Sequence, residues 1–181
     1  MTSSTFINNT AGGNGGGIDS WGQNSIIYDN TFINNTANHG GGIYQGGNNT
    51  NVTSSTFTGN NAITSGGGIR WIGSNGILSE SIFTNNTSNA GGNITGGAII
   101  WYVTGSMIDC NFINTKWDTS NEIYIKYNLN IQGGKGIVTI FNEGTLSGIS
   151  IVVLNNETYY YPPNTNINLA DKFKNKRSRQ R

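Results

Sequence analysis

Two acidic residues are the side chains of this sequence best placed to do chemistry. Glu80 and Asp109 each stand three positions before a repeated phenylalanine, in consecutive copies of an internal repeat. If the copies stack as strands roughly 4.8 Å apart, the two carboxylates approach the separation of about 5 to 5.5 Å found in retaining glycosidases, where one is the acid and the other the nucleophile. Asp29 holds the same position in an earlier copy, but Ser54 interrupts the row of acids between Asp29 and Glu80, and Arg70, the only arginine of the repeats, lies on another face. We therefore expect solvated surface acids and no catalytic residue, with a polysaccharide hydrolase or lyase that uses this pair as the alternative.

Neither a metal nor a cofactor is expected. Two carboxylates are few for Ca²⁺, which takes about six to eight oxygen ligands. The stretch from Gly12 to Asp19 is similar to a calcium-binding β-roll repeat, but later copies do not repeat its terminal acid. The single cysteine, Cys110, excludes an intrachain disulfide and a cysteine-rich metal site. The glycine-rich stretches lack the following helix and lysine of a phosphate-binding loop.

Aromatic residues near a repeating isoleucine are the candidates for ligand contact. Side chains alternate between the two faces of a strand. Trp71 and Trp101, two positions after an isoleucine, are therefore expected to point into a core, whereas Tyr44 and Tyr124, one position after, are expected to point outward. Because aromatic faces suit sugar rings, we predict Tyr44, Tyr124 and Trp21 as contact residues.

Three asparagines are candidates for glycosylation. Asn8, Asn34 and Asn85 each open an Asn-x-Thr triplet, two positions after a repeated phenylalanine. That position is expected to be an exposed turn, where a glycan can be attached.

Composition indicates a folded protein with a polar, uncharged surface. The chain holds 30 Asn and 27 Gly but only 10% charged residues, against about 25% in an ordinary soluble domain. Its 4 Trp, 8 Tyr and 7 Phe argue against disorder. The net charge of +1 includes a basic stretch at residues 171–181, which we interpret as a solvated tail and not as a nucleic-acid contact. No apolar stretch approaches the roughly 20 residues of a membrane span, and no signal peptide is evident at the start.

An internal repeat defines the elements that must position these residues. Phenylalanines recur at spacings of 26, 25, 26 and 29 residues. Asparagine follows by three positions in four copies, and the same four copies end in Gly-Gly-Ile or Gly-Ala-Ile. The columns are Phe6, Phe32, Phe57, Phe83 and Phe112; Asn9, Asn35, Asn60 and Asn86; and Ile18, Ile43, Ile69 and Ile99, with Ile123 in the fifth copy.

These columns predict stacked strands. Each phenylalanine and the small residue two positions before it share one face of a strand, which we expect to point inward, and the apolar residue five positions before it is a second inward position beyond a corner. Glycine and asparagine suit the turns between strands. No copy buries its apolar face alone, so like residues stack over like. A period near 26 residues supports two or three strands per copy, about half of a propeller blade. The sequence predicts an all-β fold, a right-handed parallel β-helix of about five rungs.

Three segments are expected. Residues 1–125 are the β-helix, residues 126–170 are further strands that form either a cap or the start of an immunoglobulin-like module, and residues 171–181 are a disordered basic tail. Strands are predicted at 136–141 and 149–154, the second in a hairpin with 158–161. Met1 aligns with an inward apolar position, so the chain is expected to begin inside a rung and to be part of a larger protein. An uncapped rung is an open sheet edge, which predicts edge-to-edge self-association.

The pairing of Phe-x-x-Asn with Gly-Gly-Ala/Gly-Ile resembles the repeats of chlamydial polymorphic membrane proteins and of methanogen adhesin-like surface proteins, both similar to pectin-lyase-like β-helices. The resemblance covers residues 1 to about 125. It implies a secreted or cell-surface adhesin without catalytic residues, whose partners are glycans or proteins on host or neighbouring cells.

Overall fold

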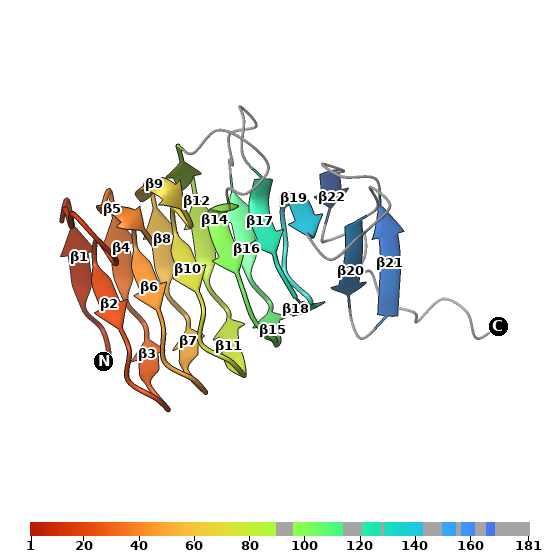
Figure 1. Cartoon of the computed structure of the whole chain (residues 1–181), viewed down its shortest axis with the longest axis horizontal. Helices are drawn as coiled ribbons and strands as arrows, with labels where there is room; N and C mark the ends of the chain where they lie inside the picture. The colour runs from red at the N-terminus through yellow and green to blue at the C-terminus, as the bar shows by residue number, and fades with distance from the viewer. Residues whose placement is uncertain are drawn as a thin grey trace.

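Short strands, each two to six residues long, are the only regular elements in the described part of the chain. The structure is a computed structural model, and it describes residues 1–89, 96–113, 121–127, 129–142, 150–154, 157–161 and 166–168. The strands stack into a parallel β-solenoid of about four turns, with the N-terminus at one end of the stack (Figure 1). The predicted all-β parallel coil is therefore confirmed.

The phenylalanine column forms one sheet. Phe6, Phe32, Phe57, Phe83 and Phe112 pair in register between parallel strands. The five strands of this sheet mark the beginnings and ends of about four full turns of the chain. In order across the sheet the strands are β1 (Thr5–Ile7), β4 (Thr31–Ile33), β8 (Thr56–Thr58), β12 (Ile82–Thr84) and β16 (Asn111–Ile113).

The isoleucine column forms a second sheet. Ile18, Ile43, Ile69, Ile99 and Ile123 pair in register, as the repeat predicted. The strands, in order, are β2 (Ile18–Ser20), β6 (Ile43–Gln45), β10 (Ile69–Trp71), β14 (Gly96–Trp101), β17 (Asn121–Ile125), β19 (Ile137–Asn142) and β22 (Asn166–Asn168).

Two further sheets complete each turn. One carries the apolar residues five positions before each phenylalanine, which are buried from Ile27 onward. It contains β3 (Ile26–Tyr28), β7 (Asn51–Thr53), β11 (Gly76–Ser79), β15 (Gly105–Ile108), β18 (Leu129–Gln132), β20 (Ser150–Leu154) and β21 (Glu157–Tyr161). The fourth sheet contains β5 (Thr36–His39), β9 (Asn61–Ser65) and β13 (Thr87–Ser88).

The expectation of two or three strands per copy is therefore wrong: the second, third and fourth turns have four each. The reason lies in the corners, which take very few residues. Asp29, between β3 and β4, has a φ of 55°, and Asn34, between β4 and β5, has a φ of 52°. A single left-handed residue turns the chain sharply from one sheet to the next, and asparagine and aspartate tolerate this conformation better than most residues. About 26 residues thus suffice for four strands.

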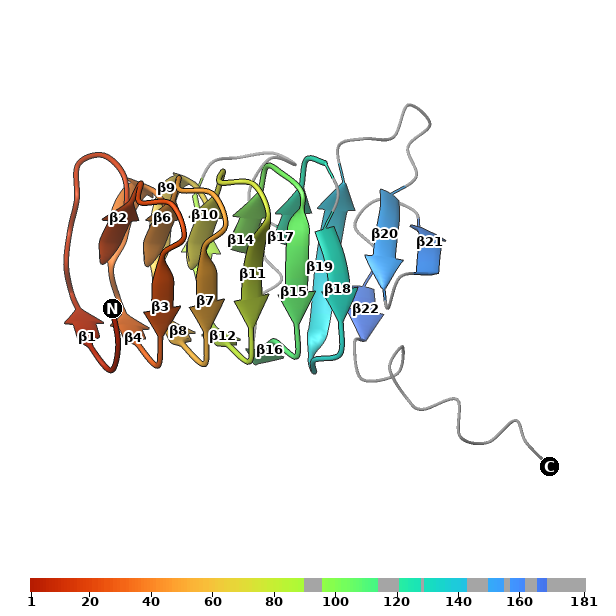
Figure 2. The ribbon, with the colours of Figure 1, turned by 90° about the horizontal axis from the view of Figure 1, so that it is seen from below.

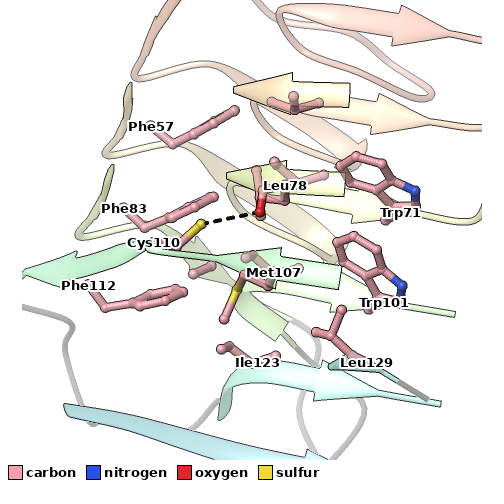
Figure 3. Packing of buried hydrophobic residues seen from close by; sticks show 14 of the residues in the cluster. Phe57, Trp71, Leu78, Phe83, Trp101, Met107, Cys110, Phe112, Ile123 and Leu129 are labelled. Carbon is pink, nitrogen blue, oxygen red and sulfur yellow. Dashed lines mark hydrogen bonds between the residues drawn. The ribbon is translucent and has the colours of Figure 1, made fainter. Parts of the chain in front are cut away.

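The interior of the coil is a set of stacked side chains (Figure 3). The rings of Phe57 and Phe83 stack with centroids 4.8 Å apart. On the opposite side, Trp71 and Trp101 stack at 4.4 Å and are fully buried, which confirms the prediction that both point inward. The asparagine column is also internal, because Asn35 and Asn60 are fully buried.

The parallel stacking extends past residue 125, where we expected the coil to end. Strand β18 pairs in parallel with β15, and β19 pairs in parallel with β17. Antiparallel pairs follow: β20 with β21, the predicted hairpin, and β19 with β22. The chain continues the coil here because Ile131 and Ile140 repeat the inward apolar positions of earlier turns. Residues 171–181 lie outside the described residues. A search of the described part found no helix with the length and hydropathy of a membrane span.

Candidate functional site

The acids predicted to share a row stand at a corner of the coil. Ser79 and Ile108 pair in register, and Glu80 and Asp109 follow them directly with φ values of 51° each. The two acids therefore occupy equivalent corners on consecutive turns, as the repeat predicted, and both are exposed. Glu80 turns the chain between β11 and β12, and Asp109 turns it between β15 and β16, each by its left-handed backbone conformation.

Two acids of this row already accept hydrogen bonds from serine hydroxyls of the preceding turn of the coil. Ser3 Oγ donates to Asp29 Oδ2 at 2.8 Å, and Ser54 Oγ donates to Glu80 Oε2 at 3.0 Å. Asp109 lies against the next turn, since a Cβ on Gly133 would meet its Oδ1. A glycosidase needs one of its two carboxyl groups protonated, a state favoured by an apolar, enclosed setting. Two exposed corner acids have no such setting.

The outer face of the isoleucine sheet brings together aromatic and basic side chains, which we call the outer patch: Trp21, Tyr44, Arg70, Tyr102 and Lys126. The Arg70 guanidinium carbon lies 4.8 Å from the ring centroid of Tyr102 and 5.8 Å from that of Tyr44. Lys126 Nζ lies 5.6 Å from the Tyr102 ring centroid, and Trp21 packs against Tyr44 at 5.4 Å. Trp21 is 58% exposed. The strands β6 and β10 hold Tyr44 beside Arg70 because these residues pair in register.

Two predicted contact residues are not accessible. Tyr44 and Tyr124 lie outside the apolar core, consistent with the expected direction, yet they are only 7% and 1% exposed. The expectation that they present free rings is therefore wrong. Trp21 and Arg70 cover Tyr44, and the Tyr102 ring lies 6.1 Å from that of Tyr124. Alternation along a strand gives the direction of a side chain but not what its neighbours cover. Of the three predicted contacts, only Trp21 is open.

Arg70 anchors a polar cluster that the sequence did not indicate. Its Nη1 donates to His39 Nδ1 at 3.0 Å and to Ser65 Oγ, and Thr64 Oγ1 also lies beside the imidazole. Ser65 Oγ also lies 3.3 Å from His39 Nδ1, so His39, which had no evident partner in the sequence, has three. Burial lowers the pKa of His39 from its ordinary value of 6.5, and the charge of Arg70 lowers it further. The one available signal was that Arg70 is the only lysine or arginine of the first four copies.

Arg70 has no negatively charged partner within the described part of the chain. Its neighbours there are His39, Ser65 and two tyrosine rings, and its Nε is buried without a hydrogen-bond acceptor. A guanidinium that is held in place and not neutralised suits the binding of an anionic group, because guanidinium and carboxylate form charge-assisted hydrogen bonds.

Comparisons with known proteins gave no match, whether against family models, curated proteins or solved structures.

The candidate glycosylation residues lie where the repeat placed them. Asn8, Asn34 and Asn85 occupy exposed corners with φ values of 55°, 52° and 51°. The third turn has Gly59 at this corner, and a Cβ there would meet Asn34 Oδ1 at 2.4 Å. Attachment of glycans to these residues stays a prediction. Among the described side chains, no group of three or more His, Cys, Asp and Glu residues is placed to share a metal ion.

Proposed function

We propose that this chain is a non-catalytic, extracellular β-helix of the adhesin-like kind, which attaches to glycans or proteins on cell surfaces through the outer patch. The observation that carries the proposal is Arg70, positioned between two tyrosine rings without a negative partner in the described part of the chain. The Phe-x-x-Asn and Gly-Gly-Ile repeat, similar to that of polymorphic membrane proteins and adhesin-like proteins, supports the same class.

The composition of the outer patch favours recognition. Tryptophan, tyrosine and arginine dominate binding hot spots, because they combine large apolar area with a polar group. Trp21 supplies an open ring, and Arg70 supplies a charge whose position is fixed before binding. Side chains that are already ordered lose less entropy when a partner binds.

Binding measurements with the full chain test the proposal. We expect tryptophan fluorescence to change on addition of a subset of a glycan panel, and the chain to bind intact cells. Trp21→Ala and Arg70→Gln should each weaken that binding by about tenfold or more. Tyr28→Ala is the matched control, because Tyr28 is also exposed but lies on a different sheet. The absence of any response to the glycans and cells, or an equal loss in the Tyr28 variant, would contradict the proposal.

A carbohydrate-active enzyme that uses Glu80 and Asp109 is the second candidate. Its support is the equivalent placement of these two acids on consecutive turns. Incubation with acidic and neutral polysaccharides, followed by a reducing-end assay, distinguishes the two functions. Release of new reducing ends that Glu80→Gln abolishes would favour the enzyme, whereas binding without product favours the adhesin.

A further inference from the structure

The phenylalanine sheet repeats regularly along the axis of the coil. Here the inward rings of Phe6 and Phe32, Phe32 and Phe57, and Phe57 and Phe83 are parallel to within 4°, 5° and 4°. Their centroids are 5.0, 4.8 and 4.8 Å apart. The five strands of this sheet follow one another along one side of the coil (Figure 2), and the last pair of rings, Phe83 and Phe112, is less regular, at 5.3 Å and 14°.

Two rows of side chains cover the outer face of this sheet. Because the phenylalanines point inward, the residues directly before and after them point outward. The rows pair in register from strand to strand, without a shift. The first row is Thr5, Thr31, Thr56, Ile82 and Asn111, and the second row is Ile7, Ile33, Thr58, Thr84 and Ile113.

These rows form a rigid, uncharged array. Nine of the ten residues are Thr or Ile, so nearly every side chain is β-branched and restricted at χ1. The central members, such as Thr56 and Thr58, are half-buried by their neighbours. The face therefore offers hydroxyl and methyl groups at fixed positions. It carries no charge for an ion pair and no open aromatic ring for a sugar.

The spacing of the array is close to that of ice. Water molecules in ice form tetrahedral hydrogen bonds of about 2.75 Å, so that second neighbours lie about 4.5 Å apart. The rung spacing of the sheet, about 4.8 Å, differs from this by about 0.3 Å per turn. Over four rung spacings the mismatch grows to about 1.2 Å, which is more than a hydrogen bond tolerates, so the fit is local to two or three neighbouring rungs. Water ordered on neighbouring rungs of one row therefore lies close to ice-lattice positions.

We propose that the outer face of the sheet β1-β4-β8-β12-β16 binds ice. Threonine hydroxyls hydrogen-bond to water molecules at lattice positions, and the methyl groups of Thr and Ile order the water between them. Rigidity matters because a preformed array does not lose side-chain entropy when the lattice forms on it. This activity is independent of the outer patch, which lies on a different sheet.

An ice recrystallisation assay with the full chain tests the proposal. The chain should slow grain growth in frozen solution, and single ice crystals grown in its presence should be faceted. Thr58→Tyr places a bulky ring in the middle of the array and should raise the concentration needed by about tenfold or more. Thr53→Tyr is the matched control, because Thr53 is an outward, half-exposed threonine of the same turn on the neighbouring sheet. It should retain the activity.

Circular dichroism and thermal unfolding verify that both variants fold. If Thr58→Tyr does not fold, Thr31→Lys is compared with Thr53→Lys. The first variant places a charge on the proposed ice-binding face, and the second places the same charge on the neighbouring sheet. Grain growth equal to that in serum albumin solution would overturn the proposal. An equal loss in the Thr53 and Thr58 variants would also overturn it, because the activity would then not belong to this face.

Discussion

The side-chain amide of Asn60 joins three turns of the coil. Its Nδ2 donates to Asn86 Oδ1 at 2.9 Å, and its Oδ1 accepts from both the backbone N–H and the Nδ2 of Asn35, each at 3.0 Å. The same Nδ2 donates to the Phe32 carbonyl at 2.9 Å. Asn60 is fully buried, so these bonds satisfy groups that water cannot reach. The asparagine column thus completes the backbone hydrogen bonding at a corner.

Replacement of Asn60 should therefore be strongly destabilising. Asn60→Ala leaves the Asn35 N–H and the Phe32 carbonyl buried without a partner, and we expect a loss of about 3 kcal/mol in the free energy of unfolding. Urea denaturation measures the loss. Asn61→Ala is the control, because Asn61 is adjacent but only partly buried and accepts one bond from Thr87. We expect it to cost about 0.5 kcal/mol, and equal costs at the two positions would contradict the role of the column.

The Cys110 thiol should be unreactive in the folded chain. Burial raises its pKa to about 12, and the reactive thiolate is therefore scarce at neutral pH. We expect negligible alkylation by iodoacetamide without denaturant and rapid alkylation in urea, both measured by intact mass. Rapid modification of the folded chain would show that the turn carrying Cys110 opens easily.

Serine should replace Cys110 at little cost. Ser55 and Ser81 occupy the same inward column, and each hydroxyl donates to the carbonyl two residues before it, at 3.0 and 2.9 Å. Cys110 Sγ makes the equivalent contact with Ile108 at 3.6 Å. We expect Cys110→Ser to change the free energy of unfolding by less than about 1 kcal/mol, whereas Cys110→Leu, which overpacks the column, should cost about 1 to 3 kcal/mol.

The stability of the coil should fall on mild acidification through His39. The pKa of His39 is lowered in the folded chain, first by burial and then by Arg70, so the unfolded chain binds more protons between the lowered value and 6.5. The stability that the neutral His39 allows is therefore fully present above about pH 6.5. The free energy of unfolding then decreases as the pH falls from there through the lowered pKa of the folded chain. Urea denaturation between about pH 7.5 and 5 measures it. A His39→Gln variant should lose stability less steeply, and an identical slope in the variant would exclude His39 as the cause.

Self-association should involve the first turn. Strands β1, β2 and β3 each lie at the edge of a sheet, where backbone groups are available to another strand. We expect concentration-dependent sedimentation, and a reduction of it by Ile7→Lys, because charge on an edge strand opposes pairing. Ile63→Lys is the control, since Ile63 is similarly exposed but lies on β9, the middle strand of its sheet. A single monomeric species at all concentrations would contradict the prediction.

The repeat alone determined that the chain is a stacked, parallel coil and which residues lie over one another in it. The spacing of Phe57 and Phe83, and of Ile43 and Ile69, was enough to place these residues over one another, because inward positions of equivalent strands must coincide when identical units stack. The asparagine column and the inward direction of Trp71 followed from the same periodicity. These features depend only on residue order along the chain.

Contacts between turns were decided by the tertiary structure. Tyr44 and Tyr124 point outward as expected, but the side chains that cover them come from other turns, at distances that no local pattern encodes. The meeting of His39 and Arg70, 31 residues apart, has the same origin. The sequence therefore specified the columns, and only the folded coil specified which side chains reach solvent and which reach one another.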